Sequence, residues 1–329
     1  MLAAALYLLE VPVSASHGWL RYLVKPLIWG VGGVLAALAA QSAYILISSH
    51  EPSAFGSSFT SALLWYRLLP SPTYQLGVLP AILLITFPML TLMLVNWLRR
   101  KSEMHVIRWL GLAGMGLVLL AGGLVVSTKI GGGSNIHNLD AFIVLVLLVG
   151  SYVWMGHWAS ERGDRPPVWK PWLLSLLIVV IPVTWNLIDV KPFVQRDIAK
   201  ANETLNGIKQ ILAAVPADRE ILFINQRQLL TFGEITGVRM APEYEVLTLS
   251  ELAISNNQAY LERFYLDLSK HRFAVIIAGQ QNTIIKDPLT APFSEENNAW
   301  VEHVSTYLLE YYRSYLTIEQ FGIEIFLPK

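Results

Sequence analysis

The residues best suited to chemistry lie in one short stretch, Ser127–Asp140, between two long apolar segments. Three consecutive glycines let its backbone approach a ligand closely and present successive N–H groups to an anion. A lysine adds a positive charge, and amide, imidazole and carboxylate groups add directional hydrogen bonds. The candidate binding residues are Lys129, Gly131, Gly132, Gly133, Asn135, His137 and Asp140. They favour a phosphate-bearing ligand, and the alternative is a tight turn that only needs glycine.

Two single residues outside this stretch are further candidates. Glu51 is the only acidic residue between Ser48 and Gln75, so it is the candidate catalytic base, with a solvated loop as the alternative. His157 is of the type that binds a haem or pigment, but the chain has no second histidine at a compatible depth and no cysteine. The sequence indicates no metal site and no resident cofactor, and it leaves a pigment at His157 open.

The candidate residues lie between or beside long apolar segments, which must hold them in place. Of the 329 residues 54% are hydrophobic and only 15% charged, and the mean hydropathy is +0.47, whereas about a quarter of a soluble domain is charged. The segments long enough to cross a membrane are Leu27–Ile47, Leu76–Leu98, Val106–Val126, Ala141–Trp158 and Trp172–Val190. Because lipid offers the backbone no hydrogen bonds, each must be helical. We therefore expect a polytopic α-helical membrane protein with about five transmembrane helices in residues 27–190. An N-terminal interfacial segment, 1–26, precedes them, and its apolar start, Met1–Val13, is expected to form a short interfacial or buried helix.

Basic residues indicate how these helices are oriented. One side of the membrane collects nine of them: Arg21, Lys25, Arg99, Arg100, Lys101, Arg108, Arg162, Arg165 and Lys170. The other side has Arg67 and Lys129. Because positive loops stay in the cytoplasm, we expect a multi-pass protein of the inner (plasma) membrane with a cytoplasmic N-terminus and an extracytoplasmic C-terminal domain. The net charge of zero favours no nucleic-acid partner.

Residues 191–329 have the pattern of a soluble α/β domain. Strands are predicted at Glu220–Asn225, Val238–Ala241, Phe273–Ala278, Tyr315–Ile318 and Ile323–Leu327, the last two as a hairpin. Helices are predicted at Pro192–Ala214, Gln228–Ile235, Leu249–Ser255, Ala259–His271 and Trp300–Tyr312. Because Ile221–Asn225 and Phe273–Ala278 are apolar without alternation, we expect them to lie adjacent at the sheet centre. The domain has no GxGxxG, Walker A or GxSxG motif, so no nucleotide or acyl chemistry is indicated.

Three stretches together suggest a family. They are Lys129-Ile-Gly-Gly-Gly-Ser-Asn135 before a span, Ile221–Phe232, and Pro242–Glu245. In these the chain, from about its second span onward, resembles the C-terminal half of bacterial GT-C membrane glycosyltransferases, which use polyprenyl-phosphate sugars as donors. The resemblance implies that the residues from Lys129 to Asn135 lie near the donor phosphate. The chain departs from the family in two respects. Its first outer loop has only Glu51 where an acidic pair is usual, and it has about half the usual number of helices.

Two functions of different classes follow. The resemblance implies a membrane protein that binds a polyprenyl-phosphate-type donor, or another anionic lipid, at the outer membrane face. Whether such a chain is an enzyme by itself stays open, and another membrane polypeptide is expected to supply the missing helices. The alternative is a non-catalytic accessory or scaffolding subunit of a larger membrane protein complex, with membrane lipid as its other partner.

The predicted orientation can be tested with cysteine substitutions, because the native chain has no cysteine. An impermeant thiol reagent applied to intact cells should label Thr283→Cys and leave Lys101→Cys unlabelled. The reverse pattern would contradict the orientation that the nine basic residues predict.

Overall fold

The structure is a computed structural model that describes residues 2–48, 63–100, 103–129, 136–162, 168–188, 190, 192 and 197–329. The chain divides into two compact units, a helical one before Lys191 and a sheet-containing one from Pro192 onward. We describe each unit by itself.

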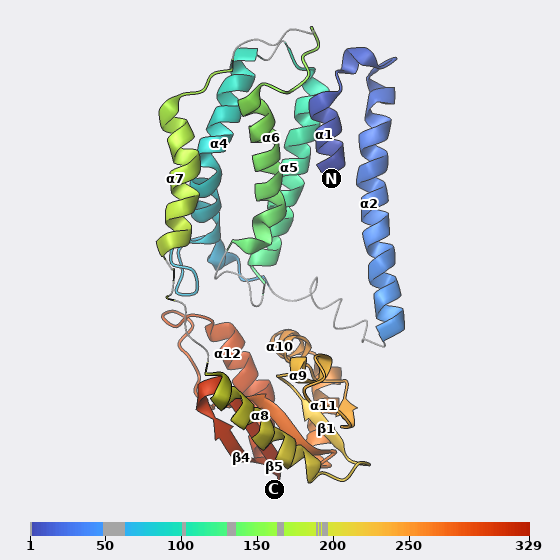
Figure 1. Cartoon of the computed structure of the whole chain (residues 1–329), viewed down its shortest axis with the longest axis vertical. Coiled ribbons are helices and arrows are strands. Elements are labelled where there is room, and N and C mark those ends of the chain that lie inside the picture. The colour runs from blue at the N-terminus through green and yellow to red at the C-terminus, as the bar shows by residue number, and fades with distance from the viewer. Residues whose placement is uncertain are drawn as a thin grey trace. The chain divides into compact units, whose positions relative to one another are not determined.

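The helical unit consists of helices and short turns. They are α1 (Leu2–Glu10), η1 (Val13–Ala15), α2 (Trp19–Ser48), η2 (Trp65–Leu68), α4 (Val78–Arg100), α5 (Val106–Ser127), η3 (His137–Leu139), α6 (Asp140–Met155) and α7 (Trp172–Ile188). Figure 1 shows α4, α5, α6 and α7 side by side, with α1 next to α5 and α2 next to α1. The unit is therefore a helical bundle with α2 at its margin.

Four helices of the described part have the length and composition to cross a membrane, as a membrane protein requires. They are Trp19–Tyr44 of α2, Val78–Arg100, Val106–Ser127 and His137–Met155. The first begins at Trp19 rather than at the predicted Leu27, because Arg21 and Lys25 interrupt the apolar run without interrupting the helix. The predicted fifth span corresponds to α7, whose 17 residues are fewer than the roughly 20 that a crossing takes.

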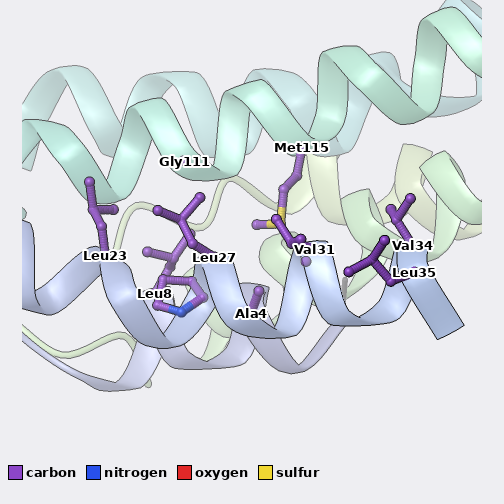
Figure 2. A pocket seen from close by; sticks show the side chains of 11 residues that line it. Ala4, Leu8, Leu23, Leu27, Val31, Val34, Leu35, Gly111 and Met115 are labelled. Carbon is purple, nitrogen blue, oxygen red and sulfur yellow. The ribbon is translucent and has the colours of Figure 1, made fainter.

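The N-terminal segment forms a helix that is buried against the bundle. Ala4, Ala5, Leu8 and Leu9 of α1 are all at most 2% exposed. Glycine at position 111 of α5 makes this packing possible, because a Cβ there would lie 2.7 Å from Leu8 Cδ1. Figure 2 shows side chains of α1 and α2 pointing toward α5 around an apolar groove of about 400 Å³. One face of α1 is thus buried inside the unit, whereas Leu2, Ala3 and Glu10 are exposed.

A buried arginine fixes the end of α1. Arg108 of α5, which is 0% exposed, donates from Nε to the Leu8 carbonyl at 2.6 Å and from Nη2 to the Leu9 carbonyl at 2.8 Å. Its Nη1 donates to the Ala159 carbonyl at 2.6 Å and to Glu161 Oε1 at 3.1 Å. A positive group bound to the last carbonyls of a helix also matches the negative end of the helix dipole. Arg108 therefore joins α1, α5 and the segment after α6.

Glu161 completes this junction. Its two carboxylate oxygens accept from the backbone N–H groups of Val13 and Ser14, each at 3.0 Å. Burial by itself would raise the pKa of Glu161, but the hydrogen bonds from Ser14, Val13 and Arg108 outweigh it and lower the pKa below its usual range. The carboxylate is therefore charged at neutral pH and holds the turn after α1.

The second unit is a five-stranded mixed sheet with helices on both faces. Its elements are α8 (Ile198–Ala213), β1 (Glu220–Phe223), α9 (Gln228–Thr231), β2 (Met240–Ala241), α10 (Val246–Ile254), α11 (Gln258–Ser269), β3 (Phe273–Gly279), α12 (Ser294–Trp300), the π-helical turn η4 (Val301–Ser305), α13 (Thr306–Tyr311), β4 (Tyr312–Ile318), η5 (Glu319–Phe321) and β5 (Ile323–Pro328). The strand order is β2-β1-β3-β5-β4. β1 is parallel to β2 and β3, whereas β5 is antiparallel to β3 and β4.

Both faces of the central strands are buried, which explains their continuous apolar sequence. Leu222 of β1 and Ile276 of β3 face a core shared with α10, α11 and α13. Ile221 and Ile277 face the opposite core, which includes Ile208 of α8. The prediction that β1 and β3 are adjacent is confirmed, with β3 at the sheet centre. The C-terminal hairpin is confirmed as well.

The helix predicted at Trp300–Tyr312 differs from the observed structure at both ends. The helical segment begins at Ser294, passes through η4 and ends at Tyr311, and β4 begins at the next residue. The stretch from Ser294 to Asn298 is polar, so apolar periodicity does not mark its helical start. Tyr312 is buried and donates its hydroxyl to the Phe273 carbonyl at 3.0 Å, which holds the first residue of β4 against the sheet.

An ion network joins the elements around β1 in this unit. Arg272 Nε lies 2.7 Å from Glu220 Oε2, and its Nη1 lies 2.7 Å from Asp267 Oδ2. Its Nη2 lies 3.4 Å from Glu243 Oε2. The Tyr244 hydroxyl donates to Asp267 at 2.7 Å. Burial, and then the hydrogen bond to Asp267, raise the pKa of Tyr244. One guanidinium thus contacts three carboxylates, and Arg239 Nη2 lies 3.3 Å from Oε1 of Glu220 as a second cation.

We predict that residues 192–329 unfold cooperatively as an isolated fragment, and that Arg272→Ala lowers its free energy of unfolding by about 2 kcal/mol. The loss comes from three carboxylates that would then face one another without their shared cation. Urea denaturation followed by circular dichroism measures it, with Arg313→Ala on the exposed side of β4 as the control. Equal stability of the two variants would contradict the role of Arg272, and a non-cooperative transition would show that the unit needs the rest of the chain.

Candidate functional site

The candidate site lies where the segment before α4 meets the end of α5. The Leu64 N–H donates to the Thr128 carbonyl at 2.7 Å. Arg67, in η2, is 0% exposed, and its Nη1 donates to the Lys129 carbonyl at 3.3 Å. A buried guanidinium therefore holds the backbone at the start of the predicted binding stretch.

A tight turn places Arg67 there. Ser71 N–H donates to the Tyr74 carbonyl at 3.0 Å, and Gly77 N–H donates to the same carbonyl at 3.0 Å. Gly77 has φ +82°, and a Cβ on it would lie 2.5 Å from the carbonyl carbon of Leu69. Only glycine fits this position, because the chain folds back on itself immediately before α4. The turn packs η2 against both α4 and α5.

Two buried hydroxyl groups near these elements have unused hydrogen-bonding capacity. In the part of the chain that the structure describes, neither the Tyr74 hydroxyl nor Ser127 Oγ has a hydrogen-bond partner. Ser127 is the last residue of α5 and is 0% exposed. Tyr74 packs in the apolar cluster that contains Leu124 and Ile136, which flank the predicted binding stretch. Burial raises the pKa of Tyr74, so its hydroxyl keeps its proton and can donate it in a hydrogen bond.

The structure places some of the predicted binding residues and not others. Lys129 follows α5 directly and is half-buried, His137 is exposed in η3, and Asp140 is exposed as the first residue of α6. Asp140 also suits the positive end of the α6 dipole. The remaining candidates, Gly131, Gly132, Gly133 and Asn135, lie outside the described residues, as does the candidate base Glu51.

A second glycine, in α5, permits close contact with the residues at the end of the predicted binding stretch. A Cβ at Gly123 of α5 would lie 2.5 Å from Leu139 Cδ2 and 2.9 Å from the Asn138 carbonyl oxygen. Leu139 is 0% exposed, so η3 is packed firmly onto α5. The residues on either side of the glycine stretch, Lys129 and His137, therefore both start from fixed positions at this end of the bundle.

Arg67 is the residue that the sequence interpretation did not assign to the site. It entered only as one of two basic residues on the outer side. The signal was present, because Arg67 is the single charge in the run Leu63-Leu-Trp-Tyr-Arg-Leu-Leu69. A charge in such a run is either exposed or buried with hydrogen-bond partners, and the structure shows the second case.

The other candidates show no comparable arrangement. The side chain of His157 is exposed, just after the end of α6. Among the described residues no group of three or more histidine, aspartate or glutamate side chains is placed to hold a metal ion. The buried polar groups around Arg67 thus remain the best-defined candidate site.

The packing at Gly123 gives a direct test of how the site is held. Gly123→Ala should lower the stability of the detergent-solubilised protein by about 1–3 kcal/mol, because the new methyl group overpacks against the Asn138 backbone. Gly122→Ala is the matched control, since a Cβ there meets no described atom within 4 Å. It should leave stability unchanged or raise it by up to about 1 kcal/mol, as alanine does in a helix. Equal thermal unfolding of the two variants would contradict the observed contact.

The chain matches no family model, no curated protein and no solved structure at a level that indicates a relationship. The resemblance to GT-C glycosyltransferases therefore remains a prediction from the sequence.

Proposed function

We propose that this membrane protein binds the phosphate head group of a polyprenyl-phosphate-type lipid at the stretch that joins α5 to α6. The observation that supports this most directly is the fully buried Arg67, whose guanidinium holds the Lys129 carbonyl at 3.3 Å. A permanent positive charge bound to the backbone just before a glycine-rich stretch favours an anion near that stretch. The lipid tail of such a ligand would remain in the membrane beside the helices.

The neighbouring polar groups suit a phosphate better than a carboxylate or a neutral sugar. Lys129, whose carbonyl Arg67 contacts, adds a second positive charge to this region, and the phosphate of a lipid-linked sugar is negatively charged. The hydroxyl groups of Tyr74 and Ser127 are donors without a partner among the described residues. Phosphate offers several acceptor oxygens at once, so one head group accommodates several of these donors.

We assign the sugar-transfer reaction itself to a complex of this chain with a second polypeptide. Transfer from a lipid-linked donor needs a positioned carboxylate as general base, and the candidate in this chain, Glu51, lies outside the described residues. We propose that this chain supplies the lipid-binding half of a GT-C-type glycosyltransferase and that a second membrane polypeptide supplies the base and further helices.

The proposed topology has five crossings. It includes α7, whose 17 residues are short for a span but whose composition is wholly apolar except for Ser175, Thr184 and Asn186. With five crossings and a cytoplasmic N-terminus, the sheet-containing unit would be on the extracytoplasmic side of the inner membrane. The same topology places Arg67 and Lys129 at the outer face, where a lipid-linked sugar phosphate would be presented.

An accessory role in a larger complex is the second candidate, and one observation favours it. Only 6% of the most apolar window of α2 is buried. Gly32 and Gly33 of this helix are exposed, and a Cβ at either would meet no described atom within 4 Å. Small residues that face away from their own bundle are typical of helices that pack closely against another membrane helix.

Lipid binding distinguishes the proposed function from a merely structural turn. Lys129→Ala should weaken binding of a polyprenyl phosphate to the full-length protein by about 1.5–3 kcal/mol, through loss of a charge-assisted contact. Native mass spectrometry with the phosphate and with the corresponding uncharged polyprenol measures this, and Lys200→Ala on α8 is the control. If Lys129→Ala and Lys200→Ala bind the phosphate equally, or if the polyprenol binds as tightly, the stretch is only a turn.

A further inference from the structure

A second groove, at the end of the bundle opposite to Arg67, has features of a ligand site. It lies between α4, α5 and α6 and has a volume of about 440 Å³. Its walls are apolar along most of their length, from Leu90, Leu120 and Phe142 at one end of the groove to Trp97 and Trp109 at the other. Two indole rings therefore mark one end of an otherwise hydrocarbon-like channel.

The length of this groove matches one leaflet of a membrane. Along α5 it extends from Trp109 to Leu120, which is about 16 Å at 1.5 Å per residue. Half of a typical hydrocarbon core is about 15 Å. Small residues keep the groove open, because Ala113 and Gly116 line it and a Cβ at Gly116 would come no closer than 4.0 Å to Leu145 Cδ2. A single lipid chain has the shape that fills such a space.

Two buried donors that lack an acceptor in the described structure lie at this end of the bundle: Trp109, which lines the groove, and Arg100, which does not line it but contacts the Trp158 ring. Among the residues that the structure describes, neither Trp109 Nε1 nor Arg100 Nη1 has a hydrogen-bond partner. Arg100 is 6% exposed, and its guanidinium carbon lies 4.7 Å from the centre of the Trp158 ring. The Trp158 ring in turn lies 5.6 Å from that of Trp109. The two donors are thus connected through the Trp158 ring, which meets Trp109 edge to face.

An acidic residue near the groove pairs with only one of the nitrogen atoms of Arg100. Glu103 Oε2 lies 2.8 Å from Arg100 Nε, which leaves Nη1 without an acceptor in the described structure. A buried donor without a partner costs about 1–3 kcal/mol, so a group that supplies an acceptor here gains binding free energy. An indole N–H and a guanidinium N–H together favour a charged oxygen acceptor over a neutral one.

We propose that this groove binds an anionic phospholipid, with one acyl chain between α4, α5 and α6 and the head-group phosphate accepting hydrogen bonds from Arg100 and Trp109. The groove of Figure 2 provides a contrast in the same molecule. It has a similar volume, about 400 Å³, but its lining from Ala4 to Met115 is wholly apolar. Nothing at that groove selects a head group, whereas the groove at Trp109 combines an apolar channel with two unsatisfied donors.

The proposal is tested by titrating the full-length, detergent-solubilised protein with phosphatidylglycerol and with phosphatidylcholine of the same acyl chains, followed by native mass spectrometry. We expect phosphatidylglycerol to bind about 10-fold more tightly, and Arg100→Gln to remove most of that preference. Trp109→Phe, which removes the N–H but keeps a ring, should weaken phosphatidylglycerol binding several-fold. Lys200→Ala on α8, which belongs to neither proposed lipid site, should leave both affinities unchanged.

The groove itself is tested by a matched pair of substitutions on α5. Ala113→Phe fills the channel and should reduce binding of both lipids, whereas Ala121→Phe, on an exposed position outside the groove, should have no effect. Thermal unfolding shows that each variant is folded. Equal lipid binding by Ala113→Phe and Ala121→Phe, or equal affinity for the two lipids in the wild type, overturns the proposal. If Ala113→Phe instead changes the oligomeric mass and leaves lipid binding intact, the groove holds another polypeptide and the proposal is wrong.

Discussion

A guanidinium group buried among apolar helices must find hydrogen-bond acceptors, because water is not there to provide them. Arg108 finds four, and three of these are backbone carbonyls of residues 8, 9 and 159. The contacts tie the end of α1 to the start of α5 and to the segment after α6. Glu161, itself held by the amides of Val13 and Ser14, provides the matching negative charge. The position of the whole N-terminal segment depends on this one side chain.

The other two buried arginines also need hydrogen-bond acceptors, and they find them at opposite ends of the bundle. Arg67 holds the Lys129 carbonyl at one end of the bundle, and Arg100 reaches Glu103 at the other while its Nη1 keeps no described acceptor. A fully satisfied buried arginine is a structural element, whereas a partly satisfied one is where a ligand gains most. This difference is why the end of the bundle at Arg100 suggests an anionic ligand and the Arg108 junction does not.

The sequence predicts those parts of the fold that depend on local composition. The apolar helices and the adjacency of β1 and β3 follow from hydropathy and from the absence of alternation in Ile221–Asn225. The role of Arg67 does not follow, because its contact with the backbone of Lys129 spans 62 positions in the chain. Periodicity reports which face of an element is apolar, and it says nothing about which distant carbonyl a charged side chain will meet. The π-helical turn η4 escapes prediction for a similar reason, since its residues have ordinary helical composition.

The position of Arg108 also has a consequence for the order in which the protein is assembled. α1 precedes its partners in the chain by about a hundred residues for Arg108 and still more for Ala159 and Glu161. During synthesis the last carbonyls of α1 are therefore made long before the groups that bind them. The contacts can form only after α5 and the segment after α6 have been synthesised. The first helix of the chain is therefore fixed at its end later than it is made, when all the described helices of its unit except α7 have been synthesised.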